Sequence, residues 1–100
     1  MNENISLAEQ SIVGAILIAP ERIGDVLTQV TPAHFSSAPL RAIFAAAQEL
    51  YLANRPIDIV TVSDAAGGGD LQRIALECME TTPTAANVMT YWGILRREAE

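Results

Sequence analysis

The chain has 100 residues, of which half are hydrophobic, and a formal net charge of −6. A single cysteine excludes an internal disulfide and a multi-cysteine metal site, and six scattered arginines with no lysine disfavour strong direct binding of nucleic acid, which needs clustered cations. No apolar run is long enough to span a bilayer and the N-terminus is acidic, so we expect a cytoplasmic, single-domain protein that uses no membrane partner.

The first predicted helix opens with the tetrapeptide Ser-Leu-Ala-Glu at 6–9. This pattern is typical of a capping box, in which Ser6 caps the helix and Glu9 reaches back to it. The helix then runs to about Ala19 and is apolar nearly all round, which indicates a central, buried element. Ile12 and Ile16 are therefore predicted to lie in the core.

Two short segments follow the first helix. Pro20 suits the first turn of a second helix, in which four apolar residues share one face: Ile23, Val26, Leu27 and Val30. Thr31 and Pro32 repeat the signal of a cap followed by proline, and predict a short helical turn that carries Phe35.

The segment 36–54 is the clearest helix. Pro39 lies in its first turn, Asn54 suits a left-handed cap and Pro56 ends it. Apolar residues recur three and four positions apart and predict the buried face: Leu40, Ile43, Phe44, Ala47, Leu50 and Tyr51.

The stretch 57–66 is apolar enough for a strand, but a lone strand would have no partner in this sequence. Asp58 is a good N-cap, so we predict a short helix from about Ile59 to Ala66. A glycine triplet then breaks the chain. Asp70 is expected to cap a further helix, whose inward residues are Leu71, Ile74, Ala75 and Cys78. The predicted fold is all-α, a compact bundle of five to six short helices.

The residue pattern predicts no catalytic, cofactor-binding or metal-binding residue. The glycine triplet is followed by aspartate, whereas a phosphate-binding loop would carry lysine and serine or threonine there. His34 is the single histidine and has apolar neighbours, so a turn residue is favoured over a base. Cys78 is expected to be a buried small hydrophobe.

The last predicted helix, 84–100, has apolar residues on more than one face. Val88, Trp92 and Leu95 form a stripe that we assign to the core. Tyr91 borders this stripe, whereas Met89 and Ile94 lie off it. Because such residue types are enriched at interfaces, our candidates for a protein interface are Met89, Tyr91 and Ile94.

Three segments, in order, resemble the N-terminal domain of the bacterial replicative helicase family DnaB. They are AEQSIVGAILIAPE at 8–21, LRAIFAAAQELYLANRPIDIVTV at 40–62, and TTPTAANVMTYWGILRRE at 81–98. The chain departs from the family pattern in a contracted link, SDAAGGGDLQ, before the fifth helix. It also has His34-Phe35-Ser36 where the family has Asp-Phe-Tyr.

The resemblance implies an all-α head at 1–82 followed by the first helix of a truncated helical hairpin at 84–100. In this family, hairpins pair into a hexameric ring, and the collar binds primase and takes part in regulation by helicase loaders. The motor domain, with its ATP and magnesium, is absent from these residues. By this resemblance the chain is a non-catalytic module of an ATP-dependent DNA helicase, and it self-associates through the hairpin in the full-length protein.

Two other assignments remain open from the sequence. The helicase-binding domain of primase has a similar helical head and hairpin, although here the fold starts directly after Met1. A stand-alone or phage-encoded replication adaptor would have the same fold without a motor. The sequence downstream of Glu100 would separate these three assignments.

Overall fold

The computed structural model describes residues 3–20, 24–81, 90 and 93–94. In this part of the chain every regular element is helical: α1 (Glu3–Ile18), α2 (Gly24–Gln29), the 3₁₀ turn η2 (Pro32–His34), α3 (Ala38–Leu52), α4 (Ile59–Ala66) and α5 (Asp70–Thr81). The all-α class predicted from the sequence is confirmed. None of the helices in these ranges is long and apolar enough to cross a membrane.

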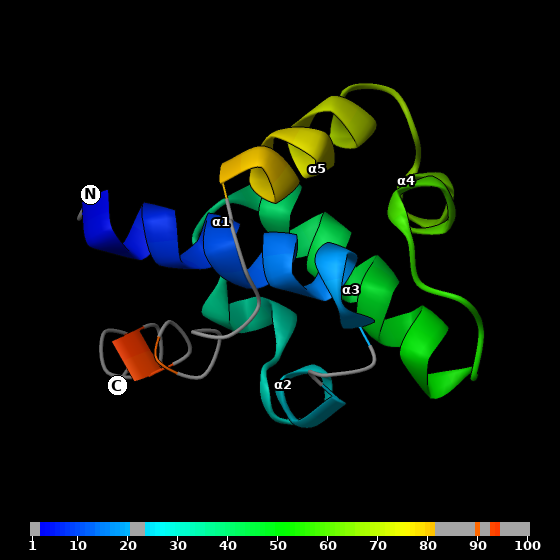
Figure 1. Cartoon of the computed structure of the whole chain (residues 1–100), viewed down its shortest axis with the longest axis horizontal. Coiled ribbons are helices and arrows are strands. Elements are labelled where there is room, and N and C mark those ends of the chain that lie inside the picture. Colours follow the sequence, from blue (N-terminus) through cyan, green and yellow to red (C-terminus); the bar gives the residue numbers. More distant parts are fainter. Residues whose placement is uncertain (1–2, 21–23, 82–89, 91–92, 95–100) are drawn as a thin grey trace.

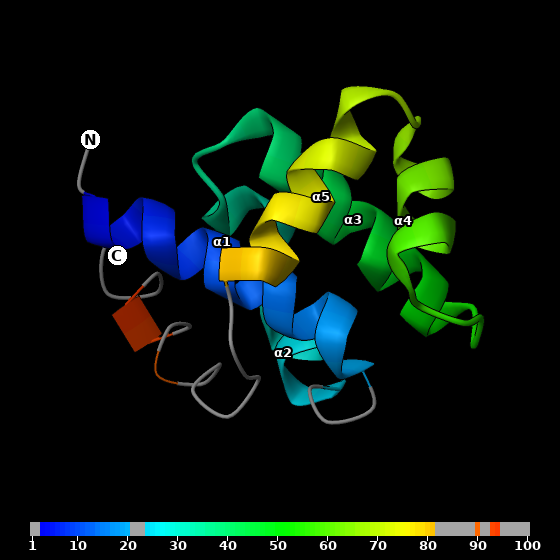
Figure 2. The ribbon, with the colours of Figure 1, turned by 45° about the horizontal axis from the view of Figure 1, so that its top comes forward.

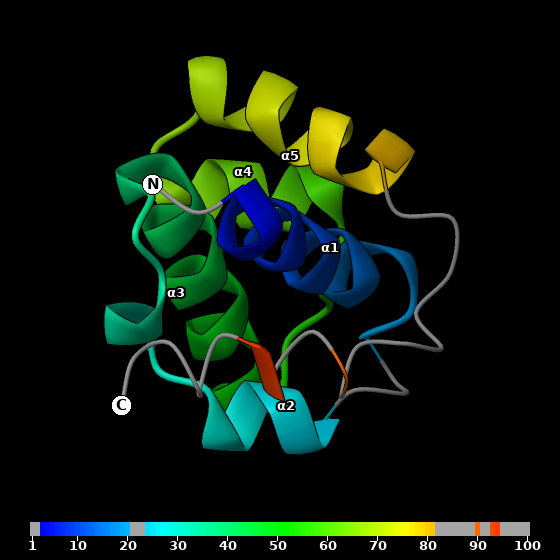
Figure 3. The same cartoon turned by 90° about the vertical axis from the view of Figure 1, so that its left-hand side faces the viewer.

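Helix α1 is the centre of the fold. It lies between α5 on one side and α2 on the other, and packs most extensively against α5 (Figures 1 and 3). Its residues Ile12 and Ile16 are almost completely buried. The predicted start was wrong: α1 already begins at Glu3, so Ser6 lies inside the helix and not at the residue before it.

The short helix α2 and the turn η2 both pack against α3, and a side chain of α3 also bonds to the backbone at the end of α2. Leu27 and Val30 are fully buried, and the Gln48 amide donates to both of their carbonyl oxygens, at 2.9 and 3.0 Å. A helix end leaves such carbonyls without an intrahelical partner. Gln48, on α3, therefore completes the C-terminal end of α2.

Helix α3 buries the face that its sequence predicts. Leu40, Ile43, Phe44 and Leu50 are all buried, and the Phe44 ring stacks on Phe35 with ring centroids 5.0 Å apart.

Tyr51 departs from this pattern, because it is 38% exposed. Its hydroxyl lies so close to Gly24 that a Cβ atom there would come within 2.6 Å of it. Tyr51 thus covers the start of α2 and does not enter the core, and Gly24 leaves room for it.

The segment Ile59–Ala66 forms the helix α4, as predicted, and Asp58 caps it. The Thr61 N–H donates to Asp58 Oδ1 at 2.8 Å, and the Asp58 N–H donates to the Thr61 hydroxyl at 2.9 Å. The three glycines that follow all have positive φ angles, from 62° to 116°, a region that side chains disfavour. Asp70 is the first residue of α5 and not the residue before it, a small correction to the predicted cap.

Ser63, in α4, has a buried hydroxyl with no hydrogen-bond partner among the described residues. We expect Ser63→Ala to stabilise the protein by about 0.5–1.5 kcal/mol, because it removes an unpaired buried polar group and raises helix propensity. Urea unfolding would measure the change. The exposed neighbour Asp64→Ala controls for propensity alone, and a loss of stability in Ser63→Ala would show that the hydroxyl has a partner.

Candidate functional site

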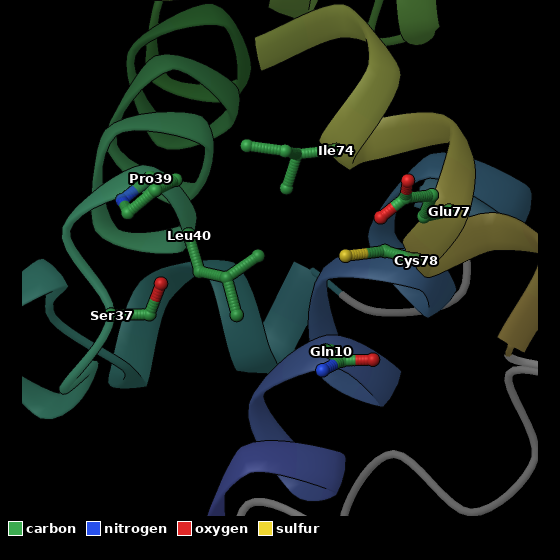
Figure 4. A pocket seen from close by; sticks show the side chains of 7 residues that line it. All are labelled: Gln10, Ser37, Pro39, Leu40, Ile74, Glu77 and Cys78. Carbon is green, nitrogen blue, oxygen red and sulfur yellow. The ribbon is translucent and has the colours of Figure 1, made fainter. Parts of the chain in front are cut away.

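A small pocket opens where α1, the start of α3, and α5 meet (Figure 4). Leu40 of α3 points into it from one side, and Ile74 and the Cys78 thiol of α5 lie on the other. Its volume is about 190 Å³, below the roughly 300–1,000 Å³ typical of small-molecule sites. The lining residues are Gln10, Ser37, Pro39, Leu40, Ile74, Glu77 and Cys78. The pocket suits a single side chain better than a nucleotide.

The thiol of Cys78 is poorly suited to chemistry. Burial raises the pKa of Cys78 to about 11, and the negative charge of Glu77 adds to the shift. The thiolate is the reactive form of cysteine, so at neutral pH almost all of this group is the weakly reactive thiol. This agrees with the expectation of a buried small hydrophobe, and Cys78 is 2% exposed.

A fully buried carboxylate, Glu9, holds α1 to the start of α3. Glu9 accepts hydrogen bonds from the Ser36 N–H at 3.1 and 3.2 Å, the Ser37 N–H at 3.2 Å and the Ser36 hydroxyl at 2.6 Å. Sequence reasoning assigned Glu9 to a local capping box and missed this role. The acid does meet the N-terminal end of a helix, but that helix is α3, and the donors Ser36 and Ser37 are 27 and 28 residues further along the chain.

The remaining candidates for chemistry have structural partners. His34 Nδ1 lies 3.1 Å from the Thr31 N–H and 3.0 Å from the Thr31 hydroxyl, within the turn predicted for it. Over the residues that the structure covers, no three His, Cys, Asp or Glu side chains gather as they would around a metal ion. The glycine triplet connects α4 to α5, as expected of a linker.

The predicted interface lies mostly outside the described residues. That holds for the candidates Met89 and Tyr91, and for three residues assigned to the core, Val88, Trp92 and Leu95. Ile94 is described: it is half-buried and packs against the core cluster of the head. A partner chain would thus reach only part of its side chain, and its interface role stays a prediction.

Comparison with known proteins identifies the family. The model of the DnaB-like helicase N terminal domain matches residues 1–97. The chain is 34% identical over 98 residues to the replicative DNA helicase DnaB of Mycobacterium leprae (strain TN), a match that covers 92% of this chain and 16% of that protein. For the replicative DNA helicase DnaB of Leifsonia xyli subsp. xyli (strain CTCB07), the identity is 32% over 99 residues, covering 93% of this chain and 22% of the relative.

A solved structure agrees with these matches. The crystal structure of the N-terminal domain of DnaB helicase from Mycobacterium tuberculosis matches with a TM-score of 0.81 and 30% sequence identity, covering 93% of this chain and 69% of that one. The chain therefore spans less than a quarter of the length of the two helicases named above, and most of one solved domain. On these matches, which run almost from end to end, the chain belongs to the family of DnaB-like helicase N-terminal domains.

Proposed function

We propose that this chain is the non-catalytic N-terminal domain of a replicative DNA helicase, acting in ring assembly and in recruitment of primase and loader proteins in the cytoplasm. The observation that carries the proposal is the match over residues 1–97, because it identifies an N-terminal domain and no other part of a helicase. ATP and magnesium would be bound by a motor domain elsewhere in the parent protein. The small pocket and the weakly reactive Cys78 thiol are consistent with a domain that acts by binding other proteins and not by catalysis.

The proposal extends to self-association through a helical hairpin. Roughly a third of the solved Mycobacterium tuberculosis domain lies outside the match to this chain. We infer that the partner helix of residues 84–100 belongs to that remainder, and that Met89, Tyr91 and the exposed part of Ile94 contact it or a neighbouring subunit. A hexamer built in this way would need sequence beyond this chain.

The purified 100-residue chain is expected to hydrolyse no ATP above the buffer rate, since its sequence contains no phosphate-binding loop. A phosphate-release assay with magnesium measures this. Hydrolysis that rises with the concentration of the chain and survives further purification would contradict the non-catalytic assignment.

Recruitment is tested with the protein encoded by the complete gene. If the reading frame continues into a second amphipathic helix and a motor domain, the product should sediment as a hexamer and bind the primase of the same genome. Failure to bind primase would refute the recruitment role while leaving ring assembly intact. A frame that stops near Glu100 would replace the helicase assignment with the adaptor assignment.

A further inference from the structure

A second concave surface lies between α4 and α5, which are next to each other (Figure 2). This open groove has a volume of about 450 Å³, and its lining is mostly apolar. We call it the α4–α5 groove and define it by its lining residues: Ile59, Gly69, Gln72, Arg73 and Leu76. It is separate from the pocket that contains Cys78.

Leu76 is the main apolar side chain that the groove presents to solvent. Helix α5 directs Ala75 and Cys78 into the core, whereas Leu76 lies on its outer face and is 47% exposed. An isolated exposed leucine needs no explanation. Here, however, the leucine lines a groove together with the half-buried Ile59 of the neighbouring helix, and Val60 on that helix is 64% exposed.

The segment that forms α4 and α5 carries a strongly negative net charge, although the one charged residue of the groove lining is Arg73. From Asp58 to Thr81 the chain carries one arginine and five acidic residues, a net charge of −4 out of −6 for the whole chain. The acidic residues are all exposed: Asp58, Asp64, Asp70, Glu77 and Glu80. Arg73, the one cation, contacts Glu77 at 3.0 Å, so its charge is partly offset locally.

We propose that the α4–α5 groove binds a basic amphipathic helix of a partner protein. Apolar residues on one face of that helix would contact Leu76 and Ile59, as in other complexes where a helix lies in a groove. Its lysines and arginines would lie near the acidic residues of α4 and α5. Opposite charge speeds association and selects among partners.

The same charge disfavours other occupants. Nucleic acid would be repelled by a segment of net charge −4, and a second copy is itself acidic, with a net charge of −6. The proposal rests on the surface of α4 and α5 and does not depend on the replication role, so either can fail without the other.

The test is an NMR titration of the ¹⁵N-labelled full chain with a synthetic leucine–lysine peptide of about 18 residues, or about five helical turns, whose leucines form one stripe. The expected shifts map to Ile59, Gly69, Gln72 and Leu76. A peptide with glutamate in place of lysine should not bind, and neither should single-stranded DNA.

Two matched pairs of variants locate the site. Leu76→Gln should weaken binding about fivefold or more, because the groove loses its central apolar contact. Leu52→Gln, at a leucine that is 72% exposed near the end of α3, should leave it unchanged. Glu80→Gln should weaken binding more than Glu49→Gln, although each removes one exposed negative charge.

Several results would overturn the proposal. Equal weakening by Leu76→Gln and Leu52→Gln would show general adhesion of the peptide. Shifts centred on another surface, or no shifts at millimolar peptide, would exclude the groove as the site. Shifts of the groove residues that depend on the concentration of the chain alone would identify a second copy as the occupant.

Discussion

Phe44→Ala is expected to lower the free energy of unfolding by about 3–5 kcal/mol, the range for a large side chain removed from a packed core. Phe44 is fully buried and stacks on Phe35, 5.0 Å away between ring centroids. The substitution therefore leaves a cavity and also removes an aromatic contact between α3 and the segment that precedes it. Thermal and urea unfolding followed by circular dichroism would measure the loss.

Leu52→Ala is the matched control for this experiment. It also truncates an apolar residue of α3, but Leu52 is largely exposed, so the change should stay within about 0.5 kcal/mol. For a domain of this size, a loss of 1 kcal/mol in the free energy of unfolding lowers Tm by about 4–8 °C. A difference of about 3 kcal/mol between Phe44→Ala and the control should therefore separate their Tm values by more than about 10 °C. Equal melting temperatures for the two variants would refute the core position of Phe44.

Glu9→Ala is expected to cost about 3 kcal/mol. The substitution leaves two backbone N–H groups and one hydroxyl, from Ser36 and Ser37, without the carboxylate that accepts them. Ser36 is exposed and Ser37 is half-buried, so water can replace part of what these donors lose, but a hydrogen bond to a charged group contributes about 1.5–3 kcal/mol. The carboxylate also lies at the start of α3, where a negative charge is favoured by the helix dipole. Urea unfolding at neutral pH measures the effect.

Glu9→Gln separates the two contributions. Glutamine keeps one oxygen acceptor but no charge, so it should recover part of the stability lost in Glu9→Ala. Glu49→Ala, at an exposed position on α3, should change stability by less than about 0.5 kcal/mol. If Glu9→Ala were as mild as Glu49→Ala, the hydrogen bonds between Glu9 and the serines would contribute nothing to stability.

Deprotonation of the buried Cys78 thiol is expected to lower the stability of the protein at alkaline pH. Because the pKa of Cys78 is raised to about 11 from an ordinary value of 9.0, the folded state retains a proton that the unfolded state loses. The contribution of this group to the free energy of unfolding is present below about pH 9 and is lost as the pH rises toward 11.

The elements with local signals follow from the sequence. The helix over 59–66 follows from Asp58, whose side chain and backbone bond to Thr61 and Val62, three and four residues away. The buried face of α3 follows from apolar spacing, which is a property of one helix. Such interactions need no distant partner, so the local sequence pattern indicates them.

Features that depend on distant neighbours become visible in the folded chain and not in the sequence. Glu9 fits a local capping box in sequence, but its partners are 27 and 28 residues away. Tyr51 continues an apolar stripe, yet it lies against Gly24 of another helix. The α4–α5 groove likewise exists only because two helices with separate signals pack side by side. Sequence periodicity identifies which face of a helix is apolar, but the packing of the other helices decides which part of that face is covered.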